Sequence, residues 1–232
     1  MKDIAFPFRM ASCCNSTAFG YDFGNNGLLE KLSVDYGSVP GFCNFCNKRK
    51  IEFLAGRYCS VKSIGDLIEN TCNEVIGINA DRTPRWPRGI VGSITHTKGF
   101  ASAAVAFQKN VLGVGIDVEI ILSEEKAKNL KDGILNKVER DNFLYTKSEI
   151  TFNTLCTIVF SAKESIFKCI YPLIRRYFDI SEVEIFAIDL SINQFKFRLP
   201  KEMKNVFTSP DCVGCVSIDG QYVYTAVELL KN

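Results

Sequence analysis

Two acidic side chains, Asp117 and Glu119, interrupt the apolar run VLGVGIDVEII at residues 111–121. Successive side chains of a strand alternate between its faces, so residues two apart project from the same face. Two carboxylates on one face of an apolar strand are costly to bury unless they are paired or bind a cation. Carboxylate oxygens suit Mg²⁺, with Mn²⁺ as an alternative. A strand edge with both acids in solvent explains the spacing equally well.

A second charged group lies in the segment FSAKESIFKCIY at residues 160–171. Its apolar residues recur at helical spacing, which predicts a helix that ends before Pro172. Lys163, Glu164 and Lys168 are predicted to lie opposite the apolar stripe. One interpretation is a surface ion pair between Glu164 and Lys168, worth about 0.3–0.5 kcal/mol. The other makes Glu164 a third metal ligand and turns the lysines toward phosphate oxygens.

Candidate anion-binding residues lie earlier in the chain. Arg49 and Arg57 are eight residues apart in a segment, residues 48–68, whose apolar residues repeat at helical spacing, so both could face roughly one side of a helix. His96 is the only histidine, and its segment SITHTKG offers hydroxyls and backbone N–H groups suited to a phosphate. Solvated arginines and a structural histidine beside a turn at residues 96–99 remain open alternatives.

The ten cysteines include two C-x-x-C pairs, Cys43/Cys46 and Cys212/Cys215, which in principle make a four-thiolate zinc site. The pairs are far apart in sequence, and the second stands in DCVGCVSI beside a predicted strand, without a knuckle-like turn. No export signal precedes them, so disulfides are not expected either. We predict buried, reduced thiols.

The composition of the 232 residues bounds the kind of protein. Hydrophobic residues make up 47% and charged residues 23%, which permits a packed core, and the length falls between one domain and two. The net charge of +2 excludes a general nucleic-acid binder, so anions must be held by local basic clusters. Without a signal peptide or an apolar run of about 18 residues, we expect a soluble, cytoplasmic protein.

The elements that must position these residues follow from periodicity and turn chemistry. Short strands and loops are predicted for residues 1–47, and an irregular loop for the proline-containing residues 81–89. A strand precedes the turn at residues 96–99, and residues 101–107 form either strand or helix. The C-terminal half is predicted to be α+β, with one or two basic helices at residues 123–148 and strands at residues 183–189, 194–199, 213–218 and 222–229.

Five blocks occur in a meaningful order: K-R-x-x-E-F-L-A-G-R at residues 48–57, R-T-P-R-W-P at 82–87, G-S-I-T-H at 92–96, G-I-D-V-E at 115–119 and F-S-A-K-E-S-x-F-K at 160–168. In this order they resemble the 4′-phosphopantetheinyl transferases that activate siderophore and other nonribosomal peptide synthetases, most closely the enterobactin-synthesis branch. The resemblance covers residues 48–172, about half of the chain.

The resemblance implies an α+β fold of two similar α/β subdomains related by pseudo-twofold symmetry, with the active site in the cleft between them. The N-terminal subdomain, residues 1–110, would bind the adenosine and phosphates of coenzyme A. The C-terminal subdomain, residues 111–232, would carry the metal and catalytic residues.

The same resemblance implies roles for individual residues. The adenosine 3′-phosphate would be held by Arg49 and Arg57, with Arg82 as a further basic residue of the coenzyme site. The phosphates would meet Thr95 and His96. Lys163 and Lys168 would neutralise the pyrophosphate, and Mg²⁺ would be coordinated by Asp117, Glu119 and Glu164. The catalytic group would comprise Glu164, Lys163 and His96, with Glu164 as the candidate base.

The implied reaction transfers the 4′-phosphopantetheine of coenzyme A to a serine of an apo carrier protein and releases adenosine 3′,5′-bisphosphate. Peptidyl, aryl or acyl carrier domains would be the partners of a monomer, docking on basic residues of the segment 123–148, Lys126, Lys128 and Lys131. A solvated helical face explains each of these lysines at least as well. Two alternatives stay open: a Mg²⁺-dependent nucleotide or coenzyme A phosphohydrolase, and a non-catalytic coenzyme A-binding module. No G-x-x-x-x-G-K-[ST] loop is present.

Overall fold

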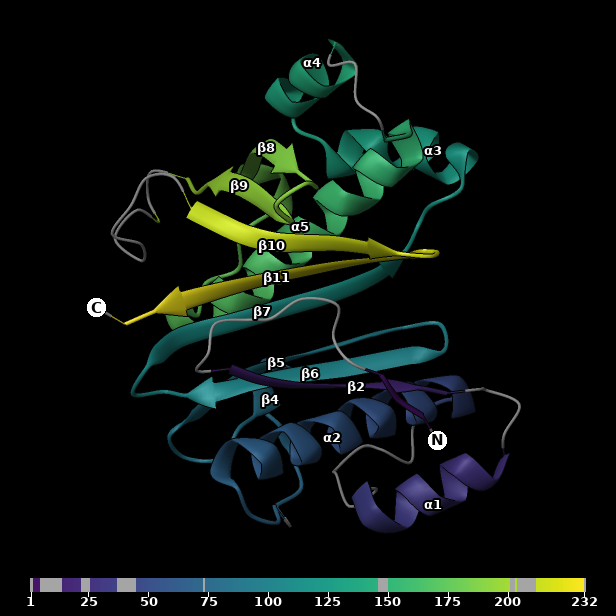
Figure 1. Cartoon of the computed structure of the whole chain (residues 1–232), viewed down its shortest axis with the longest axis vertical. Coiled ribbons are helices and arrows are strands. Elements are labelled where there is room, and N and C mark those ends of the chain that lie inside the picture. The colour runs from purple at the N-terminus through teal and green to yellow at the C-terminus, as the bar shows by residue number, and fades with distance from the viewer. Residues whose placement is uncertain are drawn as a thin grey trace. The chain divides into compact units, whose positions relative to one another are not determined.

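The computed structural model describes residues 2–4, 14–21, 26–36, 45–72, 74–145, 150–200, 203 and 212–231. Its contacts divide the chain into two compact units, Met1–Val114 with Leu230–Asn232, and Gly115–Leu229. The division falls inside a strand, four residues after the predicted boundary at residue 110. Each unit combines helices with sheet (Figure 1), so the predicted α+β class is confirmed.

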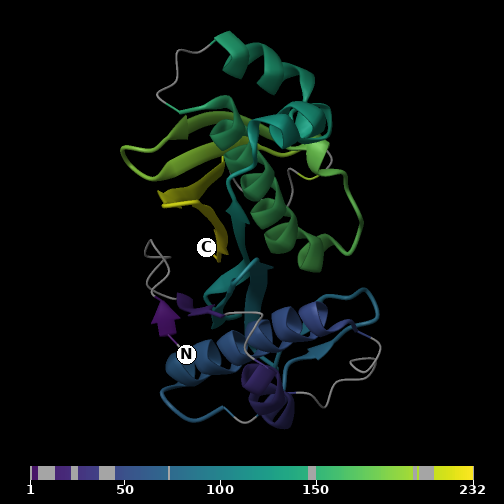
Figure 2. The ribbon, with the colours of Figure 1, turned by 90° about the vertical axis from the view of Figure 1, so that its right-hand side faces the viewer.

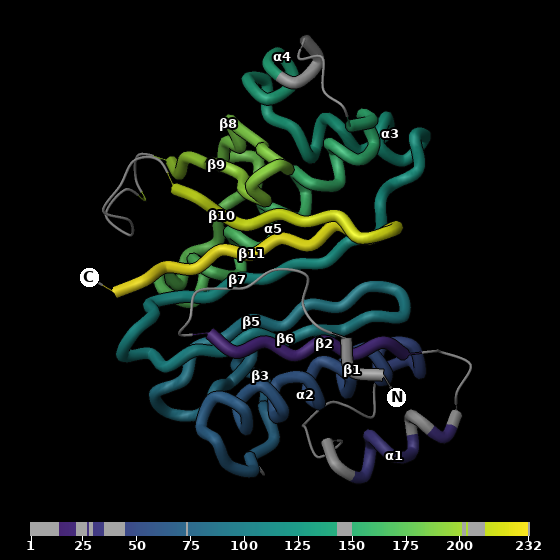
Figure 3. Tube along the Cα trace, viewed as in Figure 1, coloured from purple at the N-terminus to yellow at the C-terminus, as the bar shows by residue number. Residues whose placement is uncertain are grey.

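The N-terminal unit is built on a four-stranded antiparallel sheet in the order β1-β2-β6-β5. Helix α2 packs against this sheet, with α1 beside it (Figures 1 and 3). The bounds of these elements are β1 (Lys2–Ile4), β2 (Cys14–Gly20), α1 (Asn26–Tyr36), α2 (Asn47–Ile68), β5 (Ile90–Thr97) and β6 (Phe100–Phe107). The short strands β3 (Gly77–Ile78) and β4 (Pro84–Arg85) pair as a separate two-stranded ribbon.

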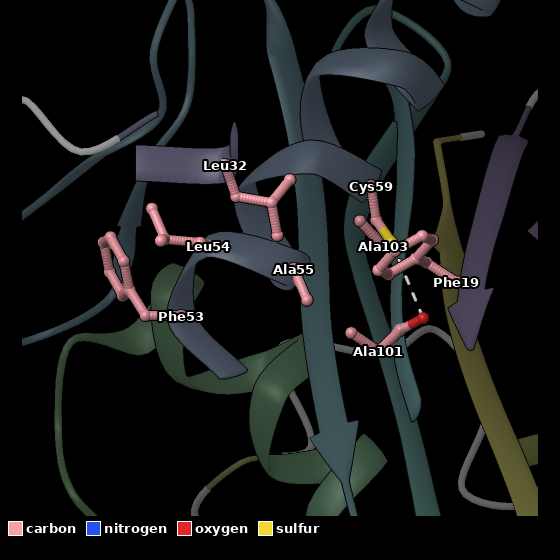
Figure 4. Close-up of a cluster of buried hydrophobic side chains, with 8 residues drawn as sticks. All are labelled: Phe19, Leu32, Phe53, Leu54, Ala55, Cys59, Ala101 and Ala103. Carbon is pink, nitrogen blue, oxygen red and sulfur yellow. Dashed lines mark hydrogen bonds between the residues drawn. The ribbon is translucent and has the colours of Figure 1, made fainter. Parts of the chain in front are cut away.

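The core of this unit lies between α2 and the sheet. Its β6 members are both alanines, which lets the helix approach the strand closely, and the large Phe19 comes from β2 (Figure 4). The Cys59 thiol is part of this core and donates to the Ala101 carbonyl oxygen at 3.5 Å. The cluster consists of Phe19, Leu32, Phe53, Leu54, Ala55, Cys59, Ala101 and Ala103.

Several sequence predictions for this unit need correction. The helix α1 was missed because glycines and asparagines around residues 15–27 indicated loops, whereas Leu32 anchors a helix against the core. The segment 81–89 is not wholly irregular, since it contains β4. The predicted turn at 96–99 begins too early, because His96 still pairs with Ala101 in the sheet. Residues 101–107 prove to be strand, and the predicted helix at 48–68 is confirmed.

The C-terminal unit contains the five-stranded sheet β7-β11-β10-β9-β8. Helix α5 packs on this sheet with α3 alongside (Figure 2). The bounds are β7 (Val111–Ile120), α3 (Glu124–Ile134), α4 (Lys137–Tyr145), α5 (Phe152–Ile174), β8 (Glu184–Asp189), β9 (Gln194–Arg198), β10 (Cys212–Asp219) and β11 (Tyr222–Leu230). These elements confirm the predicted strands and the two helices of the basic segment.

The prediction for α5 was too short at both ends. The helix begins at Phe152 and continues through Pro172 to Ile174. A proline removes one helical hydrogen bond, the one its N–H would donate to residue 168, and this loss is tolerated here within the last turn. Among the described residues no helix is both long enough and apolar enough to cross a bilayer.

Candidate functional site

A basic cluster forms where the first half of α2 meets the end of β5. It consists of Lys48, Arg49 and His96 around the carboxylate of Glu52. A Cβ atom at Gly56 would lie 2.7 Å from the Ile94 side chain, so the missing side chain lets helix and strand come close. Glu52 precedes Gly56 by one helical turn and His96 follows Ile94 on the same strand face, which brings them together.

The contacts within the basic cluster are specific. Arg49 Nη1 lies 2.6 Å from His96 Nε2. Glu52 Oε2 lies 3.6 Å from Arg49 Nη1 and 3.8 Å from His96 Nδ1. The side chains of Arg49 and His96 are 47% and 30% exposed, against 12% for Glu52. The cluster therefore presents two nitrogen-bearing groups to solvent over a half-buried carboxylate, an arrangement suited to an anion.

Arg57 is placed differently from its prediction. Its side chain is buried, with Nε donating to the Ile76 carbonyl at 2.5 Å and Nη2 to the Gly77 carbonyl at 3.2 Å. Its guanidinium also lies 4.1 Å from the centre of the Phe53 ring. Burial lowers the pKa of Arg57 to about 10, and the nearby charge of Arg49 adds to this effect. Arg57 thus links α2 to the start of β3 through two hydrogen bonds. Its buried charge adds to the positive potential around Arg49.

The structure does not bring Thr95 and His96 side chains together. Ile94 and His96 face α2, whereas Thr95 lies between them on the strand and projects from the opposite face, where it is buried. Arg82 is exposed in the turn between β3 and β4, with a positive φ of 67° and its N–H bonded to the Asn79 carbonyl. It belongs to the same compact unit as the basic cluster.

An acidic cluster lies in the C-terminal unit between β7 and α5. Gly115, Asp117 and Glu119 share one face of β7. A Cβ atom at Gly115 would overlap the carbonyl oxygen of Ser165 on α5, so this glycine permits an unusually close approach of strand and helix. That approach places the two β7 carboxylates beside Glu164 and Lys168 of α5.

Charges within the acidic cluster affect the pKa values of Glu119 and Glu164. Lys168 Nζ donates to Asp117 Oδ1 at 2.6 Å and to the Ile116 carbonyl at 3.3 Å. Burial raises the pKa of Glu119 to about 7, with Asp117 and Glu164 adding to the rise and Lys168 opposing it. Burial likewise raises the pKa of Glu164; Lys168 opposes this rise and Asp117 adds to it. The three carboxylates together carry more negative charge than the ammonium of Lys168 can neutralise.

The three carboxylates have the chemistry of a Mg²⁺ site, since hard oxygen donors are what this cation prefers. Among the described residues, however, no three His, Cys, Asp or Glu side chains already stand close enough to form a ready-made metal site. Lys168 supplies the positive charge beside Asp117. The donor set fits the chemistry of Mg²⁺, and the side chains would have to rearrange to bind it.

Lys163 does not lie on an exposed face, and the prediction that it does is wrong. Its side chain is completely buried; Nζ donates to Glu139 Oε2 at 2.7 Å and to the Ile134 carbonyl at 2.8 Å. Glu139 in turn accepts from the backbone N–H groups of Asn136 and Ile185, both at 2.7 Å. Burial lowers the pKa of Lys163, which Glu139 opposes. This ion pair joins α4, α5 and β8 and leaves the ammonium no access to a pyrophosphate.

The cysteines show no zinc site within the described residues. Cys43 lies outside them. Cys46 is exposed, which corrects the expectation that all four thiols are buried, whereas Cys212 is buried and Cys215 half-buried in β10. The eight cysteines that the structure describes are thiols.

A cavity of about 290 Å³ lies beside α3 in the C-terminal unit. It is lined by Lys128, Lys131, Leu135, Arg140 and Phe152. Lys126, Lys128 and Lys131 are exposed, as the docking prediction requires. An apolar floor with a basic rim suits an acidic partner that carries an apolar anchor.

The basic and acidic clusters both lie in segments that match known protein families. Residues 41–106 match the 4′-phosphopantetheinyl transferase N-terminal domain, and residues 113–226 match the 4′-phosphopantetheinyl transferase superfamily. The first segment contains the basic cluster and the second contains the acidic cluster. The chain belongs to the 4′-phosphopantetheinyl transferase superfamily, and the resemblance read from the motifs is confirmed.

Individual relatives agree with this assignment. Enterobactin synthase component D of Salmonella typhi is 37% identical over 121 residues, covering 52% of this chain and 48% of the relative. The transferase Npt of Nocardia iowensis is 33% identical over 142 residues, 60% of this chain and 59% of its own. The transferase Svp of Streptomyces mobaraensis is 35% identical over 159 residues, 66% and 60%. The chain thus spans about half to three fifths of the length of these relatives.

Two residues that form ion pairs in the structure, Glu52 and Glu139, were not predicted from the sequence. Glu52 stands inside the quoted motif, three residues after Arg49 and four after Lys48, and this helical spacing was a usable signal. Glu139 offered none, because its partner Lys163 is 24 residues away and is reached only through the packing of two helices.

Proposed function

We propose that this protein transfers the 4′-phosphopantetheine arm of coenzyme A to a serine of an apo carrier protein and releases adenosine 3′,5′-bisphosphate. The observation that carries the proposal is the acidic cluster, in which burial and the nearby charge of Asp117 raise the pKa values of Glu119 and Glu164, inside the segment matched by the superfamily. The names of the relatives support the same reaction and suggest carriers of nonribosomal peptide and siderophore synthetases as substrates.

Each cluster has a distinct task in this proposal. Arg49 and His96 bind phosphate groups of coenzyme A, with Arg57 adding positive potential from the interior and Arg82 available at the exposed turn. Lys168 sits on the acidic cluster, where its ammonium can turn from Asp117 to a pyrophosphate oxygen. Thr95 and Lys163 support the fold through their buried positions.

Glu164 accepts the proton of the carrier serine as the hydroxyl attacks the β-phosphorus. A serine hydroxyl is a poor nucleophile until its proton is removed. Burial raises the pKa of Glu164, which makes its carboxylate a stronger base than a solvent-exposed one. The bond from the β-phosphorus to the bridging oxygen breaks, and the electron pair leaves with adenosine 3′,5′-bisphosphate.

Asp117, Glu119 and Glu164 are the residues that would hold Mg²⁺ or Mn²⁺. The ion would offset the negative charge that develops on the pyrophosphate. Removal of divalent ions with EDTA is expected to abolish transfer.

The basic helix α3 and its cavity form the proposed docking surface for the carrier. Lys128 and Lys131 both line the cavity, and Lys126 extends the charge along the helix. We further propose that the protein acts as a monomer in the cytoplasm. Localisation of a tagged protein tests the compartment, and sedimentation analysis tests the monomer.

Incubation with coenzyme A, Mg²⁺ and an apo carrier, followed by intact mass, tests the reaction. Transfer adds one phosphopantetheine to the carrier. A phosphohydrolase would cleave coenzyme A and leave the carrier mass unchanged, and a binding module would change neither molecule. Either of these two results rejects the proposal, and a panel of peptidyl, aryl and acyl carriers identifies the preferred substrate.

The variant Glu164→Gln keeps the shape of the side chain and removes its basicity. We expect transfer to fall by at least about 100-fold, while coenzyme A still binds within about threefold of wild type. Asp66→Asn, at an exposed position near the end of α2, is the matched control. Transfer by Glu164→Gln at the wild-type rate would contradict the assigned base.

A further inference from the structure

The basic cluster contains a carboxylate, which is unexpected in a site for a phosphate. Glu52 is half-buried on α2, with Lys48 at 3.9 Å, Arg49 at 3.6 Å and His96 at 3.8 Å. By charge alone, a carboxylate at this position repels an incoming phosphate. Its retention in the middle of three basic side chains therefore points to a role other than attraction.

The tautomer of His96 follows from the donors around it. A guanidinium only donates hydrogen bonds, so His96 Nε2 must accept from Arg49 Nη1 across their 2.6 Å contact. The proton of the neutral imidazole is then on Nδ1, the nitrogen that faces Glu52 Oε2. Two charged groups of α2, Arg49 and Glu52, lie beside the imidazole, and Lys48 lies 3.9 Å from the other carboxylate oxygen, Oε1.

We propose that Glu52 is a positioning residue, which holds the Nδ1–H edge of His96 and the guanidinium of Arg49 so that Nε2 and Nη1 converge on one phosphate. When that phosphate arrives, Arg49 turns its N–H onto a phosphate oxygen. His96 Nε2, released from Arg49, takes a proton from solvent and donates to another oxygen. The Glu52 carboxylate on the Nδ1 side favours this doubly protonated ring.

The phosphate is the adenosine 3′-phosphate, if Arg49 has the role given to it above; to this extent the inference rests on the proposed function. Neighbouring contacts agree with a precise geometry. Gly56 and Ile94 set the spacing of helix and strand one turn from Glu52, so the carboxylate has little freedom to drift from His96.

The test compares two ligands, coenzyme A and 3′-dephospho-coenzyme A, by calorimetry on wild type and Glu52→Gln. We expect Glu52→Gln to bind coenzyme A about tenfold more weakly and 3′-dephospho-coenzyme A within about twofold of wild type. A carboxylate that merely repels phosphate predicts the opposite sign, tighter binding by the variant, and that outcome overturns the inference. Equal weakening for both ligands also overturns it, because it indicates a general loss of structure.

Nitrogen NMR of His96 gives a readout that a purely structural role would not move. Because His96 is the only histidine in the chain, the imidazole nitrogen signals need no assignment among several histidines. At a pH where the ring is neutral, wild type should show the proton on Nδ1, and Glu52→Gln should show a larger share on Nε2. An unchanged tautomer ratio contradicts the role.

Matched variants keep this test decisive. Asp66→Asn removes the same charge from an exposed position of α2 and should leave both affinities unchanged. Glu52→Asp keeps the charge and should recover part of the affinity if the other variant folds poorly. If wild type binds neither ligand, the proposed function fails; if wild type binds and Glu52→Gln binds equally well, only the positioning role fails.

Discussion

At the scale of single residues, burial and the charges of neighbouring side chains set the pKa values of Glu119 on β7 and Glu164 on α5. Glu119 gains a pKa of about 7 because its surroundings are dry and already negative. A bound cation would offset both the cost of burying the charge and the repulsion between the carboxylates. A proton also offsets them, but a protonated carboxyl group is a poor metal ligand. If these carboxylates hold the proposed Mg²⁺, proton and metal would compete for the same oxygens.

This competition predicts a pH dependence of stability for the metal-free protein. The pKa of Glu119 is raised from 4.5 to about 7 on folding, so between these values the folded state binds more protons than the unfolded state. Its contribution to stability is present below pH 4.5 and is lost as the pH rises through 7. In EDTA, we expect the free energy of unfolding to fall by about 2 kcal/mol between pH 5.5 and pH 8.

Chemical denaturation of wild type, Glu119→Gln and the exposed control Glu125→Gln at both pH values measures this effect. The decrease should disappear in Glu119→Gln and persist in the control. Adding Mg²⁺ at pH 8 should stabilise wild type more than Glu119→Gln by mass action. An identical pH dependence in wild type and Glu119→Gln would refute the assignment.

At the scale of elements, two glycines determine how closely helices approach strands, and they differ in what a side chain would meet. At Gly115 an added Cβ meets the backbone of α5, which cannot move away without shifting the helix. At Gly56 it meets the end of the Ile94 side chain, which can rotate. At Gly133 in α3 it meets nothing within 4 Å.

Alanine at these three glycines should therefore give three different outcomes. We expect Gly115→Ala to destabilise by about 3 kcal/mol or more and Gly56→Ala by about 1–2 kcal/mol. Gly133→Ala should stabilise by about 0.5–1 kcal/mol, because alanine is the better helix former. Urea titration of the three variants measures the order, and a Gly115→Ala protein as stable as Gly133→Ala would show that β7 and α5 are not in close contact.

The elements also show how far sequence reasoning could go. Alternation in β7 predicted the shared face of Asp117 and Glu119, and the apolar repeats of α2 predicted a helix that carries Arg49, because such patterns are local. Lys163 was misplaced because α5 is buried nearly all round, so its apolar stripe does not mark the only buried face. The position of Arg57 was likewise predicted wrongly, since its carbonyl partners are Ile76 and Gly77 at the start of β3, 19 and 20 residues away.

At the scale of the whole molecule, the two compact units divide the proposed work between them. The N-terminal unit holds the basic cluster and the C-terminal unit holds the acidic cluster. Binding groups that contact coenzyme A equally in its ground and transition states affect KM, while groups that act only as the transition state forms affect kcat.

Kinetics of one variant from each unit should separate these tasks. Arg49→Gln should raise KM for coenzyme A about tenfold with kcat within about threefold. Asp117→Asn should lower kcat by at least about 100-fold with a much smaller change in KM. Lys109→Gln, an exposed cation of the N-terminal unit, controls for net charge. Equal loss of kcat in Arg49→Gln would show that the units do not divide the reaction in this way.

The close approach of Gly115 to Ser165 also bears on the folding rate of the C-terminal unit. It joins residues about 50 apart in sequence, and closing a loop of that length carries an entropy cost that local contacts do not. Asp117 and Glu164 thus come together only after β7 and α5 have docked, and non-local contacts of this kind slow folding. Peptides that span either element alone should have no site for the ion. Acquisition of divalent-ion binding during refolding would accordingly report the completion of the C-terminal unit.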